Sequence, residues 1–169
     1  MKREENFEKL VDGFRSWNVS DPEAWAESQR TEGIPQYERL VFLRGAWQTI
    51  IDEGDTSWIE PVMEQSTRRP DSPGASGGCA LKRLLSVGAD PRDIAEIVRV
   101  MQWQVLHGIV YMLADPSVVA YPTNDVPRVN WRLYAVDEHG QPTHEIGSLH
   151  ESVLETEPSG REMRPVSGS

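Results

Sequence analysis

The chain has only one cysteine, Cys79, among its 169 residues. A single thiol cannot form an internal disulfide, which excludes a disulfide-stapled secreted scaffold and fits a reducing compartment. The N-terminus, MKREENFEKL, lacks the apolar core of a signal peptide, and no run approaches the roughly 18 apolar residues of a membrane span. We therefore expect a cytoplasmic protein that has no membrane partner.

Positive charge is also scarce, because 17 Lys and Arg residues face 27 Asp and Glu residues, for a net charge of −10. Non-specific binding to nucleic acid draws most of its energy from Lys and Arg against phosphate. We therefore expect no nucleic-acid partner. The acidic residues gather towards the C-terminal end, and we interpret them as a solvated surface rather than as a mimic of DNA.

The motifs that mark common enzyme classes are missing. A zincin needs H-E-x-x-H, but the histidine that follows His144-Glu145 comes six residues after His144. A phosphate-binding P-loop needs Lys and Ser or Thr after its glycines, and here Gly78 is followed by Cys79 and Ala80. No motif points to a family with an assigned activity, so the sequence does not decide whether the protein is an enzyme, and it names no cofactor.

The apolar spacing over the first two-thirds of the chain is that of helices. Apolar residues recur every three to four positions in several segments, each bounded by Asp, Gly or Pro. These patterns predict helices over 7–17, over 22–30 with Asp21 as its cap, over 35–52 and, capped within 55–57, through about 65. They then predict a loop over 67–78 and a helix that closes at Gly88.

A longer helix is predicted from Pro91 to about Leu113. Asp90 suits its N-cap and Pro91 its first turn, while Asp115 and Pro116 follow its end. One apolar set repeats with steps of 4, 3, 4, 3 and 4: Ile94, Val98, Met101, Val105, Gly108 and Met112. A second set makes the C-terminal half apolar nearly all round: Val100, Trp103, Val110 and Leu113. We expect a core helix, with Gly108 packed closely against a helix of this chain or of a dimer mate.

The period changes to two after residue 116. Alternation over 129–136, turn residues at 137–142 and a second strand to about 149 predict a hairpin over about 129–149. Residues 155–169 are polar and predict a loosely ordered tail. The expected fold is mainly α, a single domain over 1–154 that forms a helical bundle of about five to six helices with a small C-terminal β-hairpin.

Three of the four histidines fall within residues 139–150. His144, His150 and Glu151 are the candidate metal ligands in this segment. The two histidines lie on one face of an extended strand but roughly 20 Å apart, so they meet only if the chain bends at Gly147. The alternative interpretation is a solvated polar strand face.

A glycine-rich loop flanked by basic residues is the candidate anion site. Glycines let backbone N–H groups approach an anion, and the dipole of a following helix favours negative charge. The residues of this candidate are Arg68, Arg69, Gly77, Gly78 and Lys82. The alternative is a flexible connection whose basic side chains face water.

The sequence thus contains more patterns typical of core packing than of catalysis. No nucleophile, base and orienting group occur in a recognisable pattern. The leading hypothesis is a small, non-catalytic interaction or regulatory protein, such as an immunity-like inhibitor, that binds a protein partner or forms a homodimer through the long helix. The alternative hypothesis is a metal-dependent enzyme, or a binder of a small anion or phosphate ligand, that uses the histidine segment or the loop 68–83.

Overall fold

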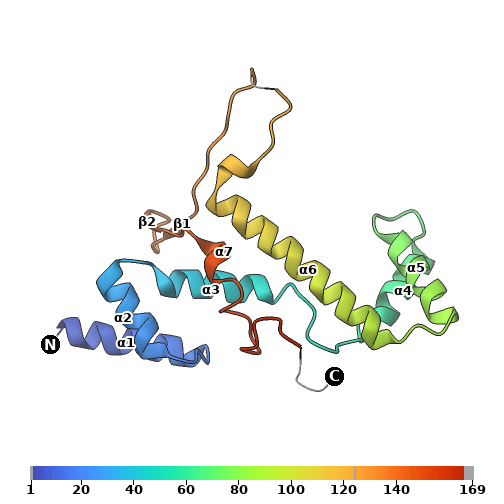
Figure 1. The fold of residues 1–169 in the computed structure, drawn as a ribbon, viewed down its shortest axis with the longest axis horizontal. Coiled ribbons are helices and arrows are strands. Elements are labelled where there is room, and N and C mark those ends of the chain that lie inside the picture. The colour runs from blue at the N-terminus through green and yellow to red at the C-terminus, as the bar shows by residue number, and fades with distance from the viewer. Residues whose placement is uncertain (1, 124, 166–169) are drawn as a thin grey trace. The chain divides into compact units, whose positions relative to one another are not determined.

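The computed structural model describes residues 2–123 and 125–165 (Figure 1). In this part of the chain there are seven α-helices, a short 3₁₀ helix and one two-stranded antiparallel sheet. The predicted fold class, mainly α with a small C-terminal hairpin, is confirmed. The seventh helix, α7 (Leu149–Ser152), has only four residues, so the longer helices number six.

The chain folds into two compact units. The first unit comprises residues 1–49 and 105–169, and the second comprises residues 50–104. The longest helix, α6 (Pro91–Ala114), begins in the second unit and ends in the first. The single domain expected over residues 1–154 stays a prediction.

The first unit opens with α1 (Lys2–Ser16), α2 (Pro22–Glu32) and α3 (Gln36–Trp47). The cap of α2 is the one that the sequence predicts, because Asp21 accepts a hydrogen bond from the Ala24 N–H at 3.1 Å. α3 ends at Trp47, earlier than the predicted residue 52, so Ile50 and Ile51 lie outside it.

Phe14 lies at the centre of the core that these three helices share. Its ring is fully buried, 5.7 Å from the Trp25 ring and 5.5 Å from the Tyr37 ring. Val11 and Leu40 belong to the same buried cluster. Because each of these residues belongs to the apolar face of its helix, the helical period places them together.

The second unit contains α4 (Ile59–Arg68), α5 (Ala75–Ser86) and the first part of α6. The predicted loop over 67–78 is too long, because α5 already begins at Ala75. Gly74 occupies the N-cap with φ of 84°, a conformation that glycine adopts without strain. Gly77 and Gly78 therefore lie in the first turn of α5.

The ends of α6 agree with the prediction. Gly88, with φ of 88°, follows the end of α5, and Asp90 accepts a hydrogen bond from the Arg92 N–H at 2.8 Å. Asp115 ends α6 and caps the 3₁₀ helix (Pro116–Val118) through the Ser117 N–H.

The hairpin is shorter than predicted. Its strands are β1 (Tyr134–Val136) and β2 (Pro142–Glu145), joined by a turn in which Asp137 accepts hydrogen bonds from two backbone N–H groups. Residues 146–149 leave the sheet because Ile146 and Leu149 turn inwards and are buried.

The start of the C-terminal segment differs from the expected loose tail. Thr156 and Glu157 are each 1% exposed, and Val153 accepts a hydrogen bond from the Trp47 indole N–H at 2.8 Å. The segment is ordered here because its side chains are buried and its backbone accepts a hydrogen bond from α3. Residues 166–169 of the expected tail lie outside the described part of the chain.

Candidate functional site

One face of α6 is apolar and open to solvent. Leu106 and Val110 are buried on the opposite face. Within the first unit the open face comprises Val105 (59% exposed), Ile109 (46%) and Met112 (37%), which we call the α6 surface. The prediction of a core helix is wrong for this face, because its side chains are exposed in the part of the chain that the structure describes.

Gly108 belongs to the same helix and is exposed. A Cβ atom built on it would meet no atom within 4 Å. The close neighbour that the sequence predicts for this glycine is therefore absent among the described residues. The glycine still costs about 1 kcal/mol of helix propensity relative to alanine.

α6 is also, among the described residues, the one helix that is long and apolar enough to cross a membrane by length and composition. Its run without Asp, Glu, Lys or Arg covers residues 100–114. At 1.5 Å per residue this run extends about 22 Å, which is less than the roughly 30 Å of a hydrocarbon core.

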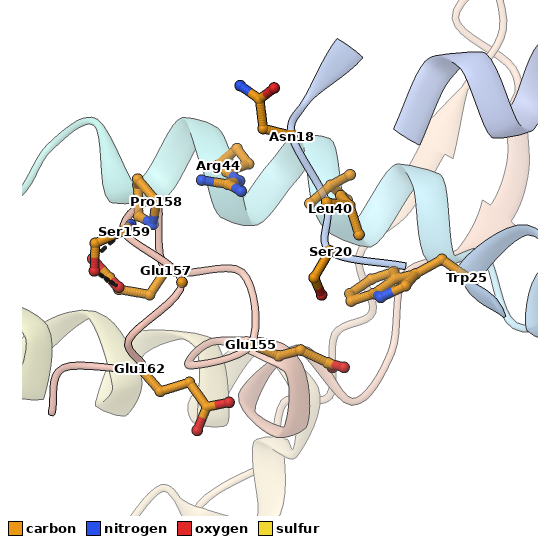
Figure 2. A pocket seen from close by; sticks show the side chains of 12 residues that line it. Asn18, Ser20, Trp25, Leu40, Arg44, Glu155, Glu157, Pro158, Ser159 and Glu162 are labelled. Carbon is orange, nitrogen blue, oxygen red and sulfur yellow. Dashed lines mark hydrogen bonds between the residues drawn. The ribbon is translucent and has the colours of Figure 1, made fainter. Parts of the chain in front are cut away.

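A second surface feature is a pocket of about 250 Å³ in the first unit. The turn at 18–20, Trp25 of α2, Leu40 and Arg44 of α3, and residues of the segment 155–162 line it. Figure 2 shows Arg44 on one side of the pocket, and Glu155 and Glu162 on the other.

Arg44 is the cationic group of this pocket. Burial lowers the pKa of its guanidinium, and the nearby Glu157 carboxylate opposes this effect. Its Nη2 donates to the Trp17 carbonyl at 3.2 Å, whereas its Nε is buried without a hydrogen-bond acceptor among the described residues.

The three carboxylates of the pocket differ in their surroundings. Glu157 is buried and accepts hydrogen bonds from the N–H groups of Ser159, at 3.1 Å, and Arg161, at 3.2 Å, so it stabilises its own turn. Glu162 lies 2.6 Å from Arg164, measured from oxygen to nitrogen. Glu155 is exposed, and its carboxylate is the one most open to a ligand.

No protein-family model, curated protein or solved structure matches this chain. The function must therefore be inferred from the geometry alone.

The histidines of the predicted metal site lie in different surroundings. His144, on β2, is exposed, and its Nδ1 lies 3.4 Å from a carboxylate oxygen of Glu38. His150, on α7, packs its ring edge-on against the Tyr111 ring at 4.6 Å. Glu151 is exposed and lies 3.9 Å from the Arg39 guanidinium.

The described residues include no group of three or more His, Cys, Asp or Glu side chains that could hold a metal ion. Metal binding by His144, His150 and Glu151 stays a prediction to which the geometry adds no support. The third histidine of the segment, His139, sits in the hairpin turn beside Glu138.

The two glycines of the predicted anion site differ, because only Gly78 has a packing role. The N–H of Gly77 donates to the Gly74 carbonyl at 2.9 Å, so it is already used. A Cβ atom on Gly78 would overlap the Ser66 hydroxyl and lie 2.7 Å from the Val62 carbonyl, so α4 occupies the space beside it.

The basic side chains of that candidate site face other groups. Arg68 pairs with Glu64 on α4, and Lys82 donates to the Thr67 hydroxyl. Arg69 is exposed at the end of α4. An anion site at these residues stays a prediction.

Neither the pocket nor the openness of α6 is evident in the sequence pattern. Arg44 carries the only early signal for the pocket, because it lies near the apolar face of the predicted helix 35–52, where a charge needs a partner. Cys79 is exposed on α5.

Proposed function

We propose that this protein is a non-catalytic, cytoplasmic interaction protein that forms a homodimer through the α6 surface. The single observation that carries this proposal is the exposed apolar face of α6. Scattered exposed apolar residues are ordinary, but a continuous apolar face usually marks an interaction site.

A second copy of the chain fits this face better than a charged partner does. Residues 100–114 contain no Asp, Glu, Lys or Arg, so the face has no formal charge with which to select a basic or an acidic protein. An uncharged apolar face can pair with itself around a two-fold axis, because the same patch serves both subunits.

Gly108 supports the same assignment. Its missing side chain faces open space within the chain, and close approach of two helix backbones is a common reason to keep a glycine in a helix. The steps of three and four residues between Met101, Val105, Gly108 and Met112 are also those of a seam between paired helices.

A membrane fits the face less well. The uncharged run is shorter than the hydrocarbon core, and the net charge of −10 opposes binding to an anionic lipid surface.

The test is sedimentation velocity over a range of protein concentrations, with Val105→Glu as the disrupting variant. The matched control is Val136→Glu on β1, because Val105 is 59% exposed and Val136 is 60% exposed. We expect the wild type and Val136→Glu to pass from 19.1 kDa monomers to dimers at about micromolar concentration, since one helix face makes a small interface. Val105→Glu should remain monomeric.

Two outcomes contradict the proposal. One is a wild-type protein that stays monomeric at all concentrations, and the other is a Val105→Glu variant that associates as the wild type does. A monomer that co-sediments with neutral phospholipid vesicles would assign the α6 surface to a membrane and would also overturn the homodimer.

A further inference from the structure

The pocket beside Arg44 has a charge arrangement that no part of the proposed homodimer uses. All its lining residues belong to the first unit, and they come from two helices, a turn and the C-terminal segment. Two of the lining residues, Asn18 and Glu162, have positive φ although they are not glycines, each with φ of 55°. Non-glycine residues in this conformation are uncommon and cluster at functional sites.

The cationic side of the pocket calls for an anionic group. A partly buried guanidinium is costly unless its N–H groups find acceptors, and carboxylates are the acceptors that bind it most strongly. The Trp17 carbonyl takes one donor of Arg44, and Nε has no acceptor among the described residues. The negative charge of Glu157 acts on Arg44, but this carboxylate already accepts hydrogen bonds from the N–H groups of its own turn.

The opposite side of the pocket offers the exposed carboxylate of Glu155 to a cationic group. Glu155 and Glu162 lie across the pocket from Arg44 (Figure 2), and the Glu162 carboxylate is paired with Arg164. A ligand with only negative charge would meet these carboxylates as like charges, and a ligand with only positive charge would meet Arg44 in the same way. A ligand that carries both charges satisfies both sides.

We propose that the pocket binds a small zwitterion of amino-acid size, with its carboxylate towards Arg44 and its ammonium group towards Glu155. A volume of about 250 Å³ holds a molecule of this size. Trp25 and Leu40 form the apolar wall against which an aliphatic side chain packs.

The test measures the melting temperature and the calorimetric affinity of the full-length chain with glycine and with L-leucine. Isocaproate and isoamylamine serve as the two halves of leucine, because the first lacks the amino group and the second lacks the carboxylate. We expect leucine at millimolar concentration to raise the melting temperature by mass action, and each half to bind about tenfold more weakly.

Two variants locate the site. Glu155→Gln removes an exposed charge, so it should fold normally and bind leucine about tenfold more weakly. Arg44→Gln should lose binding as well, provided that the loss of its bond to the Trp17 carbonyl leaves the fold intact. Glu138→Gln, which removes an 87% exposed charge in the hairpin turn, is the matched control and should bind as the wild type does.

Three outcomes overturn the proposal. The first is that neither glycine nor leucine changes the melting temperature. The second is that Glu155→Gln binds leucine with unchanged affinity. The third is that one half of leucine binds as tightly as the whole molecule. The last outcome would assign the pocket to a simple organic cation or to a simple anion. Dimerisation does not enter any of these measurements, so they are independent of the proposed function.

Discussion

Glycines show most clearly how surroundings decide the role of a residue. Gly77 and Gly78 are adjacent in the sequence and lie in the same turn of α5. The Cβ position of Gly77 nevertheless faces open space, whereas that of Gly78 lies directly against α4. The sequence presents them as one glycine-rich motif with a single purpose. In the structure, Gly78 permits the approach of two helices, and Gly77 has no contact that requires a glycine.

The first prediction follows from this difference. Gly78→Ala should destabilise the protein by about 1 to 3 kcal/mol, because its Cβ atom would overlap the Ser66 hydroxyl and the Val62 backbone carbonyl. Gly77→Ala should stabilise it by about 0.5 to 1 kcal/mol through helix propensity. Urea unfolding of both variants measures the two free energies, and changes of the same sign would contradict the packing assigned to Gly78.

At the scale of the element, some features of α6 were predictable from the sequence and others were not. Its N-cap at Asp90 and its end before Asp115 follow from local rules of capping and chain stereochemistry. The apolar period was also correct. Which apolar side is covered depends on the neighbours of the helix, and a helical pattern contains no information about them.

The second prediction separates helix propensity from helix pairing. Gly108→Ala should raise the dissociation constant of the dimer about tenfold or more, because a side chain would hold the two α6 helices apart. The matched control is Gly45→Ala on α3, another exposed helical glycine with no atom within 4 Å of its Cβ position. This control should gain about 0.5 to 1 kcal/mol in helix stability and leave dimerisation unchanged.

Analytical ultracentrifugation of both variants provides the comparison. If Gly108→Ala dimerises as tightly as the wild type, the two helices do not meet closely at this position, and the seam assigned to α6 is wrong.

At the scale of the molecule, the dominant physical quantity is the net charge of −10. The charge opposes the approach of two copies at long range, while the α6 surface itself carries no formal charge over residues 100–114. Apolar attraction at short range and repulsion at long range therefore act in opposite directions. Dissolved salt screens the repulsion and leaves the apolar contact largely unaffected.

The third prediction is that salt strengthens the dimer. The dissociation constant should fall several-fold between about 10 mM and about 150 mM sodium chloride, because the screening length shortens from about 30 Å to about 8 Å. Sedimentation equilibrium at both salt concentrations measures the effect, with Val105→Glu as a monomeric control. A dissociation constant that rises with salt would show that charge pairs, rather than the apolar face, hold the dimer together.

The sequence by itself determined the mainly α fold, the boundaries of α6, the cap at Asp21 and the position of the hairpin turn at 137–142. These features depend on interactions between residues a few positions apart, and such interactions are legible in a linear pattern. Only the tertiary structure decided that one face of α6 is open, that Gly78 serves packing, and that Arg44 and Glu155 line one pocket. The reason is that Arg44 and Glu155 are more than a hundred positions apart, so long-range packing alone brings them together.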